Sequence, residues 1–560
     1  SWDRAGPAPP GRTAGIRFAA RGAPVQRLFT RPCPPGHGGE STAGCTDGVE
    51  QKPSRRTFLT IAAAGAGGLA LTGAGLPSRT LPRDPFTLGV ASGDPSRDGF
   101  VLWTRLAVDP LAPDGRGGMP SRDVDVEWQV AADERFARVV RSGAETARPG
   151  AAHSVHVEPA GLEPGREYFY RFRVAGHVSP TGRTRTAPVA LSPLTLAVAA
   201  CAHYEHGYYT AYRRLAEQEP DLVVHLGDYL YEYAHRGYTA PGGAVRRHAG
   251  DRCATLADYR LRHAQYKTDP DLRAAHAAAP WLVAFDDHEV ENNWAAGVSG
   301  NGTPRFARRR ADAFRAYYEN MPLRRASVPH GASMRVHRRV DWGPLARFHL
   351  LDTRQFRDDQ ACDDGARAGC DDRLDTGRSM LGEDQRRWLL DGLAASGARW
   401  NLVGQQVLMA RKDTRVGPGS EVNLDSWDGY AAERARLLAG FRDSGAANPV
   451  VLTGDAHMHH AADLRLDFDD PDSPRVAVEL VTSSISSDGD GYRDEGKVAE
   501  TIAENPHISY LDQRRGYIVC RVTAGELSAD FRTLDRISRR GAPARTGARF
   551  TVPAGRSALV

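Results

Sequence analysis

From residue 194 onward, short apolar runs alternate with segments of helical periodicity, and this alternation is the strongest constraint on the fold. Runs of this length suit strands that are buried on both faces, and such strands between helices predict an α/β domain. We place this domain at residues 194–535. The expected strands are residues 194–200, 222–226, 281–285, 346–351, 400–404, 449–453, 476–481 and 516–522. The expected helices are residues 208–218, 256–267, 305–318, 383–396 and 431–442.

Residues 82–190 show a different pattern. Apolar and polar residues alternate with period two between Pro- and Gly-containing turns, which predicts a small antiparallel β-sandwich. The sequence Leu-x-Pro-Gly-x-x-Tyr-x-Tyr-Arg at residues 162–171 resembles the corner of fibronectin type III modules. After the α/β domain, residues 536–560 are expected to form a loose tail.

Length and charge narrow the class of protein further. A single core stops growing near about 250–300 residues, so 560 residues predict two domains plus appendages. The net charge is only +4, from 73 Lys and Arg against 69 Asp and Glu. This balance argues against a nucleic acid or a membrane surface as a partner. Only 4 of the basic residues are Lys, so arginine is too common here to mark a site by itself.

The N-terminal region predicts an export signal. Residues 1–53 are rich in Pro, Gly, Ala and Arg without a sustained period, which favours a disordered leader. The pair Arg55-Arg56 then precedes a short apolar stretch, within a signal region at residues 54–76. This pattern is typical of twin-arginine signals; a buried helix with a chance arginine pair is the alternative. We therefore expect a secreted or cell-envelope protein that uses the twin-arginine export machinery and has no stable membrane anchor.

Five cysteines lie after the signal region. Cys362 and Cys370 flank an Asp- and Gly-rich loop and could pair in an oxidising compartment. If Cys253 paired with Cys520, Cys201 would remain as a thiol, but spacing does not establish that second pair.

Potential metal ligands directly follow four of the expected strands, and ligands in α/β sheets gather at such strand ends. Carboxylate, imidazole and phenolate groups suit hard or borderline cations, and a thiolate adds affinity for iron or zinc. A carboxylate such as Asp228 can bridge two cations that together clamp a phosphoryl group. The residues are Cys201 after residues 194–200, Asp228 and Tyr231 after 222–226, Asp287, His288 and Asn293 after 281–285, and Asp455 and His457 after 449–453.

Several of these residues also have an ordinary structural explanation. Asp228 could belong to a simple Gly-Asp turn, and Cys201 could be a small buried apolar residue. Asp287 could cap the following helix, and Asp455 could be a capping residue beside a surface histidine. Their joint occurrence at four strand ends favours a metal site.

Other residues could support such a site. Tyr229 and Glu232 could hold the ligands or simply pack. Two long loops, residues 233–252 and 357–380, are expected to lie over the sheet. Candidate phosphate-binding arginines in the first loop are Arg236, Arg246 and Arg247.

The motifs at the four strand ends resemble those of the PhoD family (alkaline phosphatase D), which belongs to the calcineurin-like metallophosphatases. These motifs are Cys201, Gly-Asp228-Tyr-Leu-Tyr231-Glu, Phe-Asp-Asp287-His288-Glu-Val-Glu-Asn-Asn293 and Thr-Gly-Asp455-Ala-His457. The resemblance extends over residues 86–535. It implies an αββα metallophosphatase sandwich at residues 194–535, preceded by the N-terminal β-sandwich of PhoD enzymes.

The resemblance also implies a two-metal site. A ferric ion would be held by Cys201, Asp228, Tyr231 and His457. Asp228 would bridge to calcium, with Asn293 and Asp455 as further ligands and Asp287 as a rival to Asn293. The same ligands could take zinc or manganese.

The implied activity is hydrolysis of phosphomonoesters, phosphodiesters or both, by a hydroxide that the ferric ion activates. Asp228 and His288 would be the catalytic residues, with His288 protonating the departing alkoxide. A phospholipase D-like phosphodiesterase is the alternative within the family. The alternative outside it is a secreted binding protein with a structural metal, although the chain offers more oxygen ligands than one closed site needs. We expect a monomer.

Overall fold

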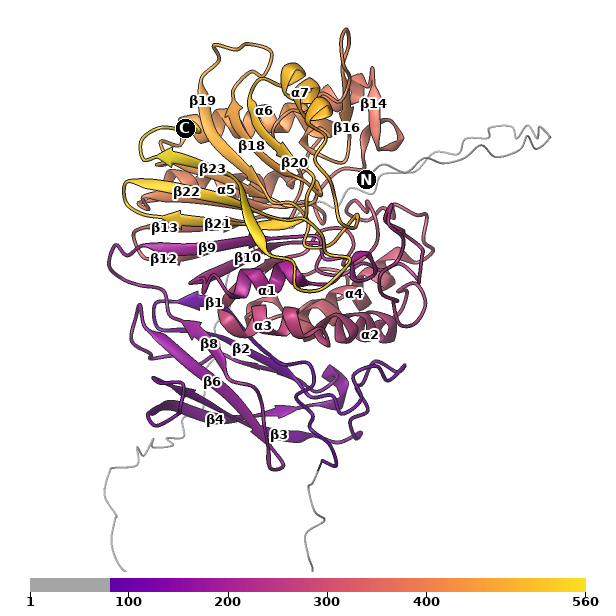
Figure 1. Cartoon of the computed structure of the whole chain (residues 1–560), viewed down its shortest axis with the longest axis vertical. Coiled ribbons are helices and arrows are strands. Elements are labelled where there is room, and N and C mark those ends of the chain that lie inside the picture. The colour runs from indigo at the N-terminus through magenta and orange to yellow at the C-terminus, as the bar shows by residue number, and fades with distance from the viewer. Residues whose placement is uncertain (1–80) are drawn as a thin grey trace, which may run out of the picture. The chain divides into compact units, whose positions relative to one another are not determined.

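The computed structural model of the chain describes residues 81–560, so the leader at residues 1–53 and the signal region at 54–76 lie outside the described residues. The described residues belong to one compact unit. Two sheets lie face to face in this unit, and helices cover the outer face of each sheet (Figure 1). This arrangement is the expected αββα sandwich.

The larger sheet joins strands from both ends of the described range. Its order is β23 (Ala544–Pro553), β22 (Glu526–Leu534), β21 (Gly516–Val522), β9 (Leu194–Ala199), β10 (Leu222–Leu226), β11 (Pro280–Ala284), β1 (Val90–Ser96), β2 (Gly99–Arg105) and β5 (Ser154–Val157). Strands β9, β10, β11 and β1 run parallel to one another. The helices on its outer face are α1 (Thr210–Ala216), α2 (Leu256–Lys267), α3 (Pro270–Ala278) and α4 (Phe306–Asn320).

The smaller sheet comes from the second half of the chain. Its order is β12 (Arg338–Trp342), β13 (Ala346–Leu350), β15 (Trp400–Gln405), β17 (Pro449–Thr453), β19 (Arg475–Val481), β18 (His459–Arg465) and β20 (Ile508–Asp512). Helices α5 (Gly382–Ala394) and α6 (Ala431–Asp443) pack on its outer face. Further elements are α7 (Glu495–Glu504) and a small pair of strands, β14 (Ala366–Ala368) and β16 (Glu421–Asn423).

The core between the two sheets is apolar. Val198 and Leu226 from the larger sheet lie in one buried cluster with Phe348 and Leu452 from the smaller sheet. Burying aliphatic and aromatic side chains on both inner faces gives the main stabilising contribution in a fold of this kind.

The strands and helices that the apolar runs and helical periods predict over residues 194–522 are confirmed. Helices α3 and α7 and several polar strands were not predicted.

The N-terminal segment differs from the expectation of a separate β-sandwich, and a fibronectin-III-like domain is not confirmed. Strands β1, β2 and β5 extend the larger sheet, because β1 pairs with β11 through Gly93 and Trp281. The remaining strands of this segment form a separate sheet. Its order is β4 (Val139–Ala147), β3 (Val124–Ala131), β6 (Glu167–Val174) and β7 (His177–Val178), with β8 (Gly182–Arg185) paired to β6. Val90 and Leu102 pack against Val126 of that sheet, so the two sheets share one buried cluster.

The expectation of a loose tail at residues 536–560 is wrong. Residues 544–553 form β23, which pairs along the whole of β22 from Leu534 to Glu526. Val552 is buried against the core between the sheets. The frequent Arg, Gly and Thr residues of this segment hide the strand pattern, because only one side of the strand faces the core.

The cysteines divide as follows. The expected disulfide between Cys362 and Cys370 is present. Cys253 and Cys520 are both free and buried, so the second pairing that we considered is wrong. Cys253 lies in the core between the larger sheet and its helices, and Cys520 lies in the core between the two sheets, so the sheet itself separates them.

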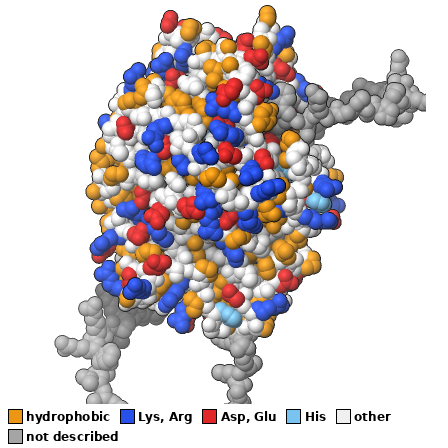
Figure 2. Space-filling model, viewed as in Figure 1, with side chains coloured by type: hydrophobic (Ala, Val, Ile, Leu, Met, Phe, Trp, Pro, Cys, Tyr) orange, Lys and Arg blue, Asp and Glu red, His pale blue; other side chains and the backbone are white. Residues whose placement is uncertain are grey.

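The surface agrees with the small net charge. Basic and acidic side chains are intermixed over the face shown in Figure 2. Among residues 81–560, no helix is long and apolar enough to cross a membrane.

A buried ion pair between α2 and α4 gives a first prediction. Arg260 donates two hydrogen bonds of 2.6 Å to the carboxylate of Glu319, and both side chains are buried. The substitution Glu319→Ala should lower the free energy of unfolding by about 3–5 kcal/mol, because it leaves a buried guanidinium without its partner. Arg315→Ala removes a half-exposed partner of the same carboxylate and should cost less than about 1 kcal/mol. Urea unfolding of the two variants measures the difference, and equal costs would contradict the prediction.

Candidate metal centre

The carboxyl ends of β9, β10, β11 and β17 meet at one place, where the two sheets approach each other closely. A Cβ at Gly227 would lie 2.7 Å from the backbone nitrogen of Asp286, and Gly227 has a φ of +103°. A Cβ at Gly454 would lie 2.9 Å from the Cβ of Ala200. Glycine at both positions therefore lets the four strand ends pack together without a side chain between them.

The backbone bends sharply at most of the expected ligands. Cys201, Asp228, Asn293, Asp455 and His457 all have left-handed conformations, with φ between 51° and 59°. This conformation is uncommon for residues other than glycine and costs free energy that the surrounding structure must offset. At Cys201, Asp228, Asp455 and His457, the side chain enters the space at the strand ends.

The structure brings the expected ligand atoms within reach of shared cations. Three sets of atoms each lie within 4.8 Å of one another, and Asp228 belongs to all three. The sets are Cys201, Asp228 and His457; Asp228, Asp287 and His288; and Asp228, Asp286, Asp287 and Asp455.

The charges at this place fit cations. One oxygen of each of Asp228, Asp286 and Asp287 is buried and has no hydrogen-bond partner. Burial raises the pKa of Asp287 to about 6, although the nearby His288 and Arg354 lower this pKa. Burial and the negative charge of Asp228 also raise the pKa of the Cys201 thiol well above its usual value. Crowded carboxylates and a buried thiol are stabilised in their ionised forms when a cation lies among them.

Tyr231 lies directly beside Asp228. Its hydroxyl is 2.7 Å from Asp228 Oδ2 and 3.0 Å from His457 Nε2, and Ser487 Oγ lies 2.7 Å away on a third side. The phenol oxygen thus points into the same space as the Cys201, Asp228 and His457 ligand atoms.

His457 is oriented by a carboxylate that the sequence analysis missed. Asp488 Oδ2 lies 2.7 Å from His457 Nδ1, which leaves Nε2 to face Asp228 and Tyr231. Burial lowers the pKa of His457, but Asp488 and Asp228 raise it by more, so that the pKa is about 9. Asp488 lies in the loop after β19, and no local pattern of the sequence indicates that it meets His457. A carboxylate on the far nitrogen fixes the tautomer and orientation of a metal-binding histidine.

His288 is oriented in the same way by Glu232. Glu232 Oε2 lies 2.9 Å from His288 Nδ1, and His288 Nε2 lies 4.0 Å from Asp287 Oδ2. Burial lowers the pKa of His288, but Asp287, Asp228 and Glu232 raise it by more. The pKa therefore lies well above its usual value. Glu232 is therefore a supporting residue for His288.

Asn293 and Asp287, the two rivals for one ligand position, lie side by side. The backbone N–H of Asn293 donates a 2.7 Å hydrogen bond to Asp287 Oδ2. Asp287 shares a set of ligand atoms with Asp228, and the side-chain amide of Asn293 donates to Asp364.

Two further residues support the cluster, and the sequence patterns did not identify them. Glu289 accepts hydrogen bonds from the backbone N–H groups of Asp228, Tyr229 and Asp286 at 3.1, 2.6 and 2.9 Å, so it ties the ends of β10 and β11 together. Arg354 is fully buried and pairs with Asp286 at 2.6 Å and with Asp425 at 2.8 Å. Arg354 follows β13, but the abundance of arginine in the chain hid it.

Several other candidates lie outside the cluster. The Tyr229 hydroxyl points to His276 at 2.9 Å, and Arg246 pairs with Asp269 at 2.6 Å. Arg236 and Arg247 are exposed.

The contact between Asp488 and His457 gives a second prediction. Asp488→Asn should weaken retention of a metal ion by about 10–100-fold, because the histidine loses its charged acceptor. Metal content after dialysis against graded chelator concentrations measures the effect. Asp535→Asn is the control, since Asp535 is exposed and its nearest basic partner is Arg545 at 3.8 Å. Equal retention by both variants would show that Asp488 does not support the histidine.

Comparison with known proteins identifies the family of this chain. The PhoD-like phosphatase family model matches residues 196–531, and the model of the PhoD-like phosphatase N-terminal domain matches residues 71–188. The chain is 46% identical over 471 residues to alkaline phosphatase D of Bacillus subtilis (strain 168), covering 83% of this chain and 80% of that protein. A solved structure described as the structure of PhoD is similar with a TM-score of 0.83 and 46% identity, covering 85% of this chain and 91% of that one. The chain therefore belongs to the PhoD-like phosphatase family.

Proposed function

We propose that this phosphoric ester hydrolase carries out its reaction at the cluster around Asp228, with two cations bound side by side. The observation that carries the proposal is the presence of Asp228 in every set of converging ligand atoms. A carboxylate in that position can bridge two cations, and a bridged pair can clamp the oxygens of a phosphoryl group.

The donor chemistry supports different cations at the two positions. Cys201, Tyr231, His457 and Asp228 offer soft and anionic donors, which favour a transition metal, and iron is our assignment. Asp228, Asn293 and Asp455, with Asp287 as the rival of Asn293, offer oxygen atoms alone, which favour calcium. Zinc or manganese could substitute, because the geometry of the ligands does not exclude them.

The bound metals would supply positive charge that polarises the phosphoryl group and makes water more acidic. The chain itself supplies the proton for the leaving group. His288 is held at Nδ1 by Glu232, so its Nε2 faces the cluster and can carry a proton there. Donation from this nitrogen to the departing alkoxide would favour cleavage of the ester bond.

A third prediction tests this function. The mature protein with iron and calcium should hydrolyse a chromogenic phosphomonoester, a chromogenic phosphodiester or both, and Asp228→Asn should reduce turnover to background. The physical reason is the loss of one charge at the position that both cations share. The ratio of the two rates distinguishes a monoesterase from a phospholipase D-like diesterase.

The control is Asp535→Asn, which should retain the wild-type rate because Asp535 is exposed and lies apart from the cluster. Circular dichroism shows whether Asp228→Asn is folded. Wild-type turnover by a folded Asp228→Asn variant under the same conditions would contradict the proposal.

We further propose export through the twin-arginine route, which rests on Arg55-Arg56 and the apolar stretch that follows. A fourth prediction is that Arg55→Lys with Arg56→Lys abolishes export of the full chain, because the receptor reads the paired arginines. Cell fractionation followed by immunoblotting measures the distribution. Arg79→Lys, outside the motif, is the control, and normal export of the paired variant would argue against this route.

A further inference from the structure

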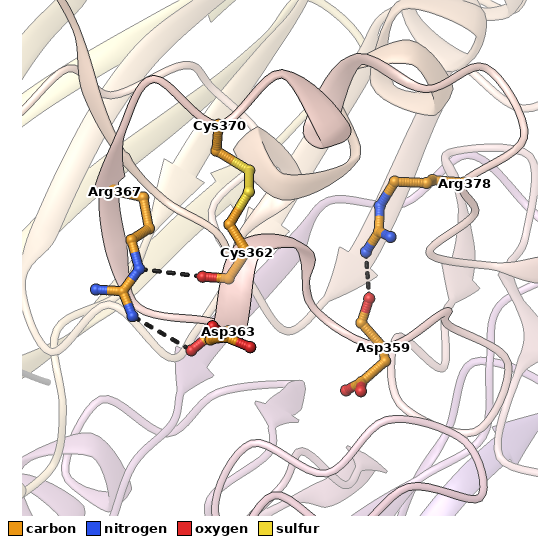
Figure 3. Close-up of a disulfide and its surroundings, with 6 residues drawn as sticks. All are labelled: Asp359, Cys362, Asp363, Arg367, Cys370 and Arg378. Atoms are coloured by element: carbon orange, nitrogen blue, oxygen red, sulfur yellow. Dashed lines mark hydrogen bonds between the residues drawn. A yellow bond between two sulfur atoms is a disulfide. The ribbon is translucent and has the colours of Figure 1, made fainter. Parts of the chain in front are cut away.

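A disulfide-closed loop lies next to the expected second cation position. The disulfide between Cys362 and Cys370 closes the loop (Figure 3). Strand β14, which lies within the loop, pairs with β16. The backbone N–H of Leu424 also donates a 2.9 Å hydrogen bond to Gly365 O. The loop is therefore fixed to the body of the protein by strand pairing as well as by the disulfide.

The backbone of this loop is strained where it approaches the cluster. Cys362, Asp363, Asp364 and Gly365 have successive φ values of 49°, 63°, 67° and 73°. Three consecutive residues other than glycine with positive φ require a surrounding structure that holds them there. The result of this turn is that the carboxylate of Asp364 points to Asn293.

Asp364 determines which end of the Asn293 amide faces the loop. The NH₂ group of Asn293 donates a hydrogen bond to Asp364 Oδ2. An ionised carboxylate only accepts hydrogen bonds, so it selects the NH₂ end of an amide and disfavours the oxygen end. The amide oxygen, which is the only side-chain atom of Asn293 able to bind a cation, is thus turned away from the loop.

The backbone of Asn293 is fixed independently of Asp364. Its N–H donates to Asp287 Oδ2 at 2.7 Å, and its carbonyl oxygen accepts from Gln360 Nε2 at 3.1 Å. With the main chain held on both sides, the remaining freedom of this residue is rotation of its side chain, and Asp364 is the group that limits that rotation.

We propose that Asp364, held by the loop that Cys362 and Cys370 close, is a positioning residue that aims the Asn293 oxygen at the second cation. The inference rests on the proposed function in one respect, the assignment of Asn293 to that cation. It gives Asp364, which lies in a separate loop, a role in positioning Asn293. It also gives the disulfide a role in cation binding.

The substitution Asp364→Asn tests the proposal with little change in shape. An amide at residue 364 can donate as well as accept, so it no longer selects one end of the Asn293 amide. We expect calcium to bind about 10–100-fold more weakly, as measured by isothermal titration calorimetry of the iron-loaded protein. The rate of ester hydrolysis should approach the wild-type value at high calcium. The control is Asp363→Asn, an exposed neighbour that should bind calcium as the wild type does.

Asn293→Ala separates failure of this proposal from failure of the ligand assignment. If Asn293→Ala binds calcium weakly and Asp364→Asn binds it as the wild type does, the positioning role is wrong. If Asn293→Ala binds calcium as the wild type does, the assignment of Asn293 is wrong and the positioning role falls with it.

A variant pair tests the contribution of the disulfide. Cys362→Ser with Cys370→Ser should weaken calcium binding in the wild-type background but cause no further loss in the Asp364→Asn background. Serine substitutions avoid a reductant, which would also act on the bound iron. An equal loss in both backgrounds would show that the loop acts without Asp364 and would overturn the proposal, and thermal unfolding shows that each variant is folded.

Discussion

The crowding of acidic groups at one edge of two sheets is the physical constraint on which the rest of the structure depends. Asp228, Asp286, Asp287 and Asp455 place ligand oxygens within 4.8 Å of one another in a largely buried space. Like charges at such distances repel strongly, and burial adds to the cost of ionising them. The fold can hold this arrangement only with compensating charge, part of which Arg354 supplies and part of which bound cations would supply.

The supporting residues form a second layer that comes from different parts of the chain. Asp488 orients His457, Glu232 orients His288, and Glu289 holds the backbone of two strand ends. Each contact is a hydrogen bond or ion pair between groups that would be costly to bury alone. The same interactions therefore stabilise the buried polar cluster and set the direction of its ligand atoms.

The segments outside the expected catalytic domain are part of the same architecture. Strands β1, β2 and β5 extend one side of the larger sheet, and β21, β22 and β23 extend the other. Arg105 in β2 is fully buried and donates to the carbonyl oxygen of Arg260 and to Asn320, so the N-terminal segment is tied to α2 and to the end of α4. The described N-terminal strands thus belong to the body that carries the cluster.

The sequence by itself determined the central strands and helices and most of the residues of the cluster. Apolar runs mark strands that are buried on both faces, and polar residues directly after such runs mark the carboxyl edge of a parallel sheet. Only the tertiary structure decided the sharing of the N-terminal strands between two sheets, the strand β23, and the partners Asp488, Arg354 and Asp364. These features depend on contacts between residues far apart in the chain, and a local pattern of polarity or spacing carries no information about which distant group a side chain will meet.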